Sequence, residues 1–362
     1  MRILFVTQYG PSMASSRTRV FQYLPCLHRH GFETRVITVV PDGGTEGSGL
    51  LATRRPWRKI FYYLLTWWRT LLCGWRAWRS SPGCDLLFVQ KVIFPWPVRV
   101  LLRLREPRVL FDFDDAIFTS EIRGLHWTAA WKERRNRRGL PAMLKLAEGA
   151  VVENDYTGNY AARYCRVTRI TGPVDTEAIR PPAGGRRAGE TVVVGWIGSA
   201  SSAQYLDLLQ VPLARLGKRC PGIRLRLVGA ASWPCAGVSV ETKEWRLEEE
   251  SGDLSGFDIG IMPLPEDPWT LGKGGYKLLQ YMASALPVVA SPVGINAEIV
   301  VDGVTGYLAG TDEQWEEKLF ALAADPELRA RLGSEGRERV EAVYSLASQQ
   351  GKFLKLLRGG SD

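Results

Sequence analysis

The chain has 362 residues, of which 45% are hydrophobic, and a formal net charge of +9. Because a single core rarely grows beyond ~250–300 residues, two domains are expected. The six cysteines lie at irregular spacings without a Cys-x-x-Cys pair, which excludes a zinc motif and a disulfide framework and favours a reducing cytosol. No apolar run reaches the ~18–20 residues that span a bilayer, and the first apolar run is too short for a signal peptide.

The positive charge is concentrated in the first half of the chain. Residues 1–180 carry 28 Lys and Arg against 15 Asp and Glu, whereas residues 181–362 carry 19 against 23. This asymmetry suggests that the first half meets an anionic surface, which is a membrane, a nucleic acid or a phosphorylated substrate.

Residues 1–171 are predicted to form a Rossmann-like α/β domain. Short apolar runs alternate with helical stretches, the pattern of a parallel sheet covered on both faces. The expected strands are Ile3 to Thr7, Thr34 to Val40, Leu86 to Gln90, Val109 to Phe113 and Ala150 to Glu153.

The loop after the first strand carries candidate anion contacts. It contains Gly10, and the next helix is expected to open with Arg17 and Arg19. A helix dipole disfavours a cation at its N-terminus, so Arg17 either contacts a phosphate of donor or acceptor or lies in solvent. Gly10, Arg17 and Arg19 are therefore the candidate acceptor or phosphate residues.

The segment 53–80 is rich in tryptophan and arginine. Between Glu46 and Asp85 there are seven basic residues and no acidic one. On a helix, one face would hold Ile60, Leu64, Trp67, Leu71, Trp75 and Trp78, opposite Arg58, Lys59, Arg69 and Arg76. This pattern predicts a helix in a membrane interface; the alternative is a helix packed on the sheet with a basic outer surface. A second basic cluster at 132–138 either extends this surface or is a solvated helix face.

A linker is predicted at 172–190, where three prolines and four glycines interrupt the apolar periodicity. A second Rossmann-like domain is expected over 191–344, and a helix within 345–362 that reaches back to the first domain. The strands expected in the second domain are Val192 to Trp196, Arg224 to Val228, Asp258 to Met262, Val288 to Ala290 and Gly306 to Ala309.

The segment Leu271 to Gly294 has the order of a phosphate site. Lys273, Gly274 and the following glycine stand at the start of a predicted helix, where free N–H groups and the dipole favour an anion. Lys277 adds charge one turn later. The alternative is an ordinary helix and strand of an α/β domain.

Several motifs of the second half resemble family 4 glycosyltransferases of the GT-B fold. In order, these are GWIGS, LVG, GFDIGIMPL, KLLQYMASALPVVASPVG and AEIVVDGVTGYL, with looser matches at ILFVTQYG and VLFDFDDAIF in the first half. The resemblance implies two Rossmann-like domains facing a cleft, a nucleotide diphosphate sugar held by the second domain, and transfer with retention at the anomeric carbon.

The resemblance also marks departures from the family. Gly272 and Gln280 stand where the family usually has two glutamates, and Gly198 and Ser199 stand where it has basic residues. Lys273 and Lys277 are the expected replacement, balancing the charge of the departing diphosphate. The remaining donor contacts implied are the backbone of Gly294, Ile295 and Asn296, and Glu298, which either binds a sugar hydroxyl or only sits in the first turn of its helix.

Asp114 and Asp115 follow the predicted strand Val109 to Phe113 and, with Asp112, lie where many members of the resembled family carry an acceptor-side catalytic group. Either carboxylate would orient or deprotonate the acceptor hydroxyl, and one of the three would otherwise cap the next helix. An Asp-x-Asp metal motif is discounted here. The catalytic candidates are Asp114, Asp115 and Lys273.

The sequence therefore predicts a retaining, metal-independent glycosyltransferase of glycan or polysaccharide biosynthesis, without a cofactor. It is expected at the cytoplasmic face of a membrane with an anionic surface, where the acceptor is lipid-linked or a membrane-proximal glycan. The main alternative is a degenerate, non-catalytic nucleotide- or glycan-binding protein. Nucleic-acid binding lacks a recognition motif, and a dehydrogenase lacks the Gly-x-Gly-x-x-Gly loop.

Overall fold

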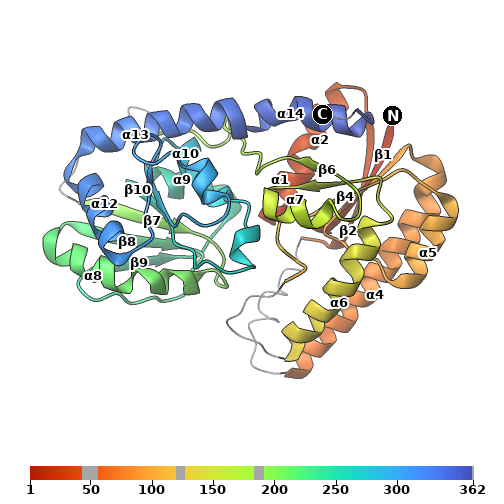
Figure 1. Cartoon of the computed structure of the whole chain (residues 1–362), viewed down its shortest axis with the longest axis horizontal. Helices are drawn as coiled ribbons and strands as arrows, with labels where there is room; N and C mark the ends of the chain where they lie inside the picture. The colour runs from red at the N-terminus through yellow and green to blue at the C-terminus, as the bar shows by residue number, and fades with distance from the viewer. Residues whose placement is uncertain (43–55, 120–126, 183–190, 361–362) are drawn as a thin grey trace. The chain divides into compact units, whose positions relative to one another are not determined.

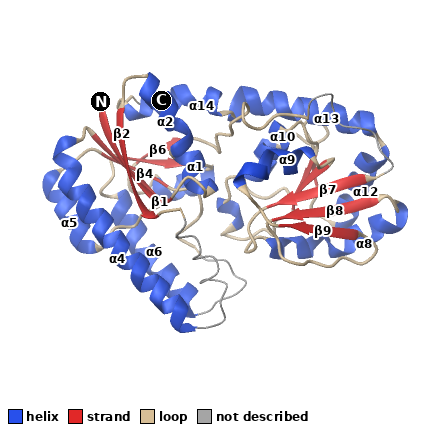
Figure 2. Cartoon of the chain, turned by 180° about the vertical axis from the view of Figure 1, so that it is seen from behind, coloured by secondary structure: helices blue, strands red, loops and turns tan. Residues whose placement is uncertain are grey.

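The computed structural model describes residues 1–42, 56–119, 127–182 and 191–360, and only the backbone of 56–60 and 127–133. The chain divides into two compact units, shown from opposite sides in Figures 1 and 2. Unit 1 comprises Met1–Pro173 with Gln350–Asp362, and unit 2 comprises Val174–Gln349. Each unit is a parallel α/β sandwich, so the predicted fold class is confirmed.

The sheet of unit 1 has the order β2-β1-β3-β4-β5-β6, and all its strand pairs are parallel. Its central strands are buried because helices cover both faces, which is why they read as continuous apolar runs. The strands are β1 Arg2–Tyr9, β2 Glu33–Val40, β3 Leu86–Gln90, β4 Val109–Asp112, β5 Gly149–Val152 and β6 Arg166–Arg169.

The helices of unit 1 include two long ones, α4 and α6, which run side by side in both views. The helices of the unit are α1 Ala14–Arg19, α2 Leu24–Arg29, α4 Pro56–Ser80, α5 Trp96–Arg105, α6 Trp127–Leu144 and α7 Asp155–Ala161. The C-terminal part of α14 (Leu346–Leu357) belongs to unit 1, where Phe353 stacks on Tyr23 with ring centroids 4.1 Å apart.

Unit 2 repeats the architecture with the strand order β12-β11-β10-β7-β8-β9. The strands are β7 Val192–Ile197, β8 Ile223–Val228, β9 Ser239–Lys243, β10 Ile259–Met262, β11 Val288–Ala290 and β12 Tyr307–Leu308. The helices are α8 Gln210–Arg219, α9 Glu250–Ser255, α10 Tyr276–Ala283, α11 Asn296–Ile299, α12 Asp312–Ala324 and α13 Pro326–Arg339.

Two features differ from the expectations. The edge strands β6 and β9, with sequences RVTR and SVETK, carry mostly polar and partly exposed residues and were not expected as strands. In the expected linker 172–190, Val174 and Ile179 are buried in the core of unit 2, so its described part packs into that unit.

Candidate functional site

In unit 2 the strand order reverses between β7 and β10, which is where ligands of open parallel sheets bind, beyond the carboxyl ends of the strands. Gly198 and Ser199 follow β7, and the chain that leaves β10 leads to Lys273 and then to α10. The topology therefore brings these predicted donor residues to one edge of the sheet.

Lys277, in the first turn of α10, reaches back toward the end of β7. Its ammonium Nζ lies 3.2 Å from the Ser202 hydroxyl and 4.2 Å from the ring centroid of Trp196. Among the described residues, no carboxylate lies within ion-pair distance of this ammonium. The pKa of Lys277 is lowered to about 7, first because the group is desolvated and second because Lys273 carries a like charge.

Glycine at position 198 makes room for that ammonium. A Cβ atom at Gly198 would lie 2.4 Å from Lys277 Nζ and 2.8 Å from Cη2 of Trp196. Any larger side chain would displace the lysine. Ser199, the other residue predicted here, is exposed, and its hydroxyl lies 3.0 Å from that of Ser201.

The N-terminus of α10 is preceded by the predicted glycine loop. No side chain caps the helix, and Gly275 at the N-cap adopts a left-handed conformation with φ of 71°. The Lys273 ammonium lies 4.7 Å from the ring centroid of Trp269, and Gly274 is buried. An uncapped helix start with two nearby lysines is suited to an anion.

The second glycine loop follows β11. Gly294 has a φ of 54°, and a Cβ there would lie 3.0 Å from the carbonyl oxygen of Leu271. The N–H of Asn296 donates to the Val293 carbonyl at 3.2 Å, and its side chain donates to Ser291. The turn thus already uses the Asn296 N–H as a donor, and its phosphate contact stays a prediction.

The other donor residues of this loop and helix differ in exposure. Ile295 is buried and Glu298 is exposed in the first turn of α11. Gln280 is 4% exposed, and its Nε2 has no hydrogen-bond partner in the described part of the chain. A buried amide without a partner is costly, so a polar group that reached Nε2 would bind favourably.

In unit 1 the strand order reverses between β1 and β3, and a cation stands there that the sequence reasoning missed. Lys91 follows β3 with φ of 61°, and its Nζ lies 2.6 Å from both Asp114 Oδ1 and Asp115 Oδ2. Its pKa is raised because the attraction of the two carboxylates outweighs desolvation. The sequence feature that could have revealed Lys91 was its position directly after the predicted strand Leu86 to Gln90.

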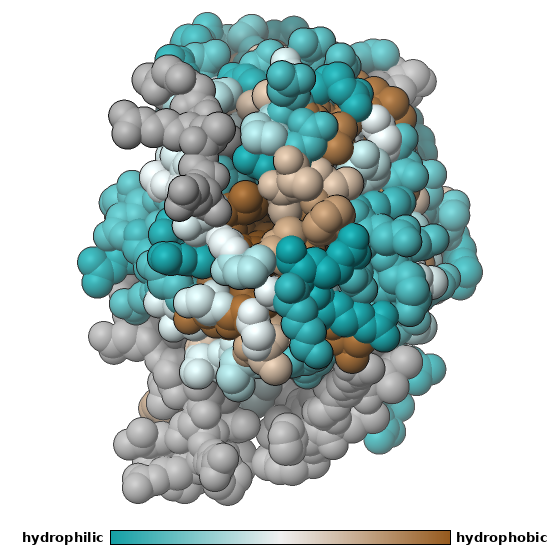
Figure 3. Space-filling model, turned by 90° about the vertical axis from the view of Figure 1, so that its left-hand side faces the viewer, coloured by the Kyte–Doolittle hydropathy of each residue, from teal (hydrophilic) through white to brown (hydrophobic). Residues whose placement is uncertain are grey.

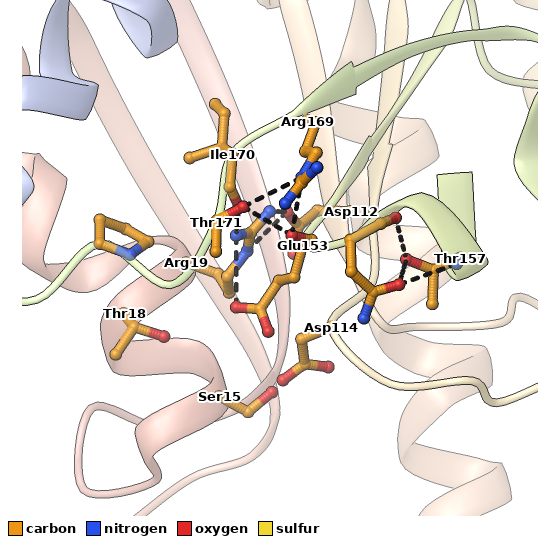
Figure 4. Close-up of polar contacts among 12 residues, drawn as sticks. Ser15, Thr18, Arg19, Asp112, Asp114, Glu153, Thr157, Arg169, Ile170 and Thr171 are labelled. Atoms are coloured by element: carbon orange, nitrogen blue, oxygen red, sulfur yellow. Dashed lines mark hydrogen bonds and ion pairs between the residues drawn. The ribbon is translucent and has the colours of Figure 1, made fainter. Parts of the chain in front are cut away.

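Arg19 lies in a buried ion cluster, which corrects its predicted role. Its guanidinium is 2% exposed, donates from Nε to Asp112 at 2.9 Å, and lies 3.4 Å from Glu153 (Figure 4). It also donates to the Ile170 carbonyl, so it joins β4, β5 and the end of β6. Arg19 is therefore not positioned to bind a substrate phosphate.

Glu153 is the residue of this cluster without a full counter-charge, since Arg19 is shared with Asp112. Burial raises the pKa of Glu153 to about 8; Arg19 opposes the shift, and the charges of Asp114 and Asp112 add to it. Figure 4 shows Asp114 and Ser15 on the side of the cluster that faces the Glu153 carboxylate.

The predicted roles of Arg17 and Gly10 also change. Arg17 lies in the last turn of the six-residue α1, not the first, and its Nη1 donates to the Ser12 carbonyl at 3.2 Å. The dipole therefore favours its charge, and the argument for an anion at Arg17 is wrong. A Cβ at Gly10 would lie 2.3 Å from Asp42 Oδ1, so a carboxylate already occupies the space beside Gly10.

Helix α4 exposes part of the predicted apolar face. Leu64, Trp67 and Trp75 are exposed, whereas Leu71 and Trp78 pack against the core. The side chains of 56–60, including Arg58, Lys59 and Ile60, lie outside the described residues, as do 53–55 and the side chain of Lys132.

Among the described residues, no helix is both long and apolar enough to cross a bilayer. No group of three His, Cys, Asp or Glu side chains in these residues is arranged to hold a metal ion.

The comparison with known proteins identifies the second unit. The model of the family "Glycosyl transferases group 1" matches residues 191–325. Residues 191–325 are a group 1 glycosyltransferase domain. This domain contains Gly198, Lys273, Lys277 and the loop of Gly294.

Characterised relatives match about half of the chain. A D-inositol 3-phosphate glycosyltransferase of Saccharomonospora viridis is 27% identical over 212 residues, 50% of this chain and 48% of the relative. An alpha-maltose-1-phosphate synthase of Mycobacterium tuberculosis is 40% identical over 190 residues, 50% of this chain and 43% of the relative. The chain thus spans about half the length of the curated relatives it matches.

Solved structures share the fold of both units of the chain. Sucrose-phosphate synthase from Thermosynechococcus elongatus aligns with a TM-score of 0.71 and 16% identity over 99% of this chain and 98% of its own. Anabaena HepE, solved in complex with UDP, aligns with a TM-score of 0.63 and 14% identity over 99% and 100%. The fold is that of the GT-B glycosyltransferases.

Proposed function

We propose that the chain is a retaining glycosyltransferase that moves a sugar from a nucleotide diphosphate donor to a lipid-linked or membrane-proximal glycan acceptor, without a metal. The observation that carries the proposal is the ammonium of Lys277, which has no carboxylate partner in the described residues and stands at the strand-order reversal of a group 1 glycosyltransferase domain. The setting is glycan biosynthesis at the cytoplasmic face of a membrane.

The donor diphosphate would be bound by charge and by backbone geometry. Lys273 and the protonated Lys277 would supply two positive charges, and the uncapped start of α10 adds N–H donors that also favour an anion. As the bond between sugar and diphosphate breaks, negative charge grows on the leaving oxygen, so these groups would stabilise the transition state more than the bound donor. Gln280 would contribute a hydrogen bond to the nucleoside through its unpartnered Nε2.

The acceptor hydroxyl would be oriented or deprotonated by Asp114 or Asp115. Lys91 bridges both carboxylates at 2.6 Å, which fixes their positions at the carboxyl edge of the unit 1 sheet. Lys91 is therefore a positioning residue in this proposal, and the two aspartates are the candidate bases.

Replacing Lys273 by alanine tests the donor half of the proposal. The side chain of Lys273 is half-exposed, so the fold should survive, while transfer to a lipid-extract acceptor from a panel of nucleotide diphosphate sugars should be lost. Full activity of the variant would contradict the phosphate site.

The acceptor half is tested with Asp114→Asn and Asp115→Asn. Loss of the base should lower the transfer rate by ~10²–10⁴-fold while nucleotide binding stays unchanged. Asp155→Asn is the matched control, because Asp155 is an exposed aspartate of unit 1 that pairs with Arg169 at 3.0 Å. Equal rates for all three variants would rule out a carboxylate base at this position, and an inverted anomeric product would rule out retention.

A further inference from the structure

Exposed hydrophobic side chains of the described residues concentrate on two helices of unit 1. Of the fifteen large hydrophobic residues exposed, nine lie on α4 and α5, and unit 2 contributes only four valines. Figure 3 shows the left-hand side of Figure 1, the side of α8 and α12 and not that of α4 and α5, and this face is mostly hydrophilic. Large exposed apolar patches mark interaction surfaces.

The exposed residues follow a line along each helix. On α4, Phe61, Leu64, Trp68, Leu72 and Trp75 recur every three or four residues, which places them on one stripe, and Trp67 lies to one side of it. On α5 the residues Trp96, Val100 and Leu104 recur every four residues, with exposures of 69%, 38% and 77%. Neither stripe is covered by another described part of the chain.

Helices α4 and α5 are fixed to one another. A Cβ at Gly74 of α4 would lie 2.7 Å from a methyl of Val98 on α5, so glycine permits close packing of the helices. Arg105 of α5 donates to the Trp78 carbonyl at 3.0 Å and lies over the Trp78 ring. The two helices, and with them the two stripes, are therefore held in a fixed arrangement.

A basic pocket lies where the α4 stripe ends. It is lined by residues 35–38 of the edge strand β2 and by Arg76, Arg79 and Ser80 of α4. Arg79 continues the stripe one turn beyond Trp75, and Arg76 is its neighbour. Among the described residues, Arg35, Arg76 and Arg79 are all exposed and none forms an ion pair with a carboxylate. Three like charges at one pocket without a counter-ion favour an anion.

We propose that α4 and α5 dock on an anionic lipid bilayer, and that Arg35, Arg76 and Arg79 bind the phosphate of a lipid headgroup there. The apolar stripes would enter the acyl boundary while the arginines stay at headgroup depth, as in interfacial helices. The aliphatic Leu64, Leu72 and Leu104 favour a bilayer over nucleic acid, which stacks on aromatic rings but gains little from leucine. This surface would hold the protein at the membrane where the proposed function places the acceptor, and in that respect the inference rests on the proposed function.

Co-sedimentation of the full chain with vesicles tests the proposal. Binding is expected to vesicles of equal parts phosphatidylcholine and phosphatidylglycerol and to be much weaker with phosphatidylcholine alone. Since one basic residue at an anionic surface contributes about fivefold in affinity, Arg35→Gln, Arg76→Gln and Arg79→Gln together should weaken binding by on the order of a hundredfold. All three are surface residues, so thermal unfolding should be unchanged.

A control variant separates the pocket from net charge. Replacing Arg29, Arg163 and Arg166 by glutamine removes the same charge from exposed positions of unit 1 outside the pocket. This variant should bind the mixed vesicles nearly as the wild type does, and equal losses for the two triple variants would overturn the headgroup site. Leu64→Ser with Leu104→Ser should weaken binding to the same vesicles; unchanged binding would overturn insertion of the stripes.

Two further readouts keep the outcome unambiguous. Tighter binding to a single-stranded RNA oligonucleotide than to the mixed vesicles, lost in the pocket variant, would overturn the bilayer in favour of nucleic acid. Nucleoside diphosphate binding measured on the same samples reports on the transferase domain alone. Vesicle binding without nucleotide binding would therefore contradict the proposed function but support this surface, and the reverse result would overturn the surface only.

Discussion

Replacing Gly198 by alanine adds one methyl group at the centre of the proposed diphosphate site. The new Cβ would lie 2.4 Å from Nζ and 2.7 Å from Cε of Lys277, distances that real atoms do not tolerate. The ammonium is the end of a flexible side chain, so it would move away while the backbone stays. Because Cη2 of the buried Trp196 is 2.8 Å away, overpacking should also cost ~1–3 kcal/mol of stability.

The expected loss of affinity follows from the bond that disappears. A hydrogen bond from an ammonium to a phosphate contributes ~1.5–3 kcal/mol, so nucleoside diphosphate binding should weaken by ~10–150-fold. Lys277→Met removes the same ammonium without adding volume and should weaken binding similarly. Since both changes remove one interaction, the double variant should be no weaker than Lys277→Met alone.

Titration calorimetry with the nucleoside diphosphate that binds the wild type measures this loss. Gly252→Ala is the matched control, because a Cβ at Gly252 of the same unit meets nothing within 4 Å. Wild-type affinity in Gly198→Ala, or losses from Gly198→Ala and Lys277→Met that add in the double variant, would refute the role of Lys277.

Three further predictions concern titrating groups. Donor affinity should be constant below pH 7, where Lys277 is already protonated, and should fall about tenfold per pH unit above it, because the free lysine must then take up a proton to bind. The fall should end at the higher pKa that Lys277 has in the complex. A flat pH profile in calorimetry would contradict this. Between pH 4.5 and about 8 the folded state keeps a proton on Glu153 that the unfolded state has lost, so the free energy of unfolding should fall by ~1.4 kcal/mol per pH unit, and urea denaturation of Glu153→Gln should lack that slope. Lys91→Met should lower the free energy of unfolding at pH 7 by ~3 kcal/mol because two close carboxylates lose their cation, and an unchanged urea midpoint would contradict the pairing.

Much of the fold could be predicted from apolar periodicity. The buried strands such as β3 and β10 read as short apolar runs, because both faces of a parallel sheet are covered. The edge strands β6 and β9 were not predicted, because residues on the solvent side of each strand are polar and break the apolar run. Periodicity also placed α4, but the predicted face includes Leu71 and Trp78, which pack against the core, since apolar side chains surround much of α4.

The residues of the site were harder to predict, because their surroundings come from distant parts of the chain. Lys277 and Gly198 are 79 positions apart, and only the reversal of strand order brings them together. Arg19 reads as a surface cation until Asp112 and Glu153 are seen to enclose it. Lys91 was missed because nothing adjacent in sequence reveals that it bridges Asp114 and Asp115.

The central claim is that the group 1 domain binds a nucleotide diphosphate at Lys277. Its most direct test is calorimetric titration of the full chain with UDP, GDP, dTDP and ADP at pH 6.5, in the presence and absence of vesicles containing phosphatidylglycerol. The account predicts that one of these nucleotides binds the wild type and that Lys277→Met weakens its binding by ~10–150-fold. Binding of none of them under either condition, or equal binding to the Lys277→Met variant, would contradict it.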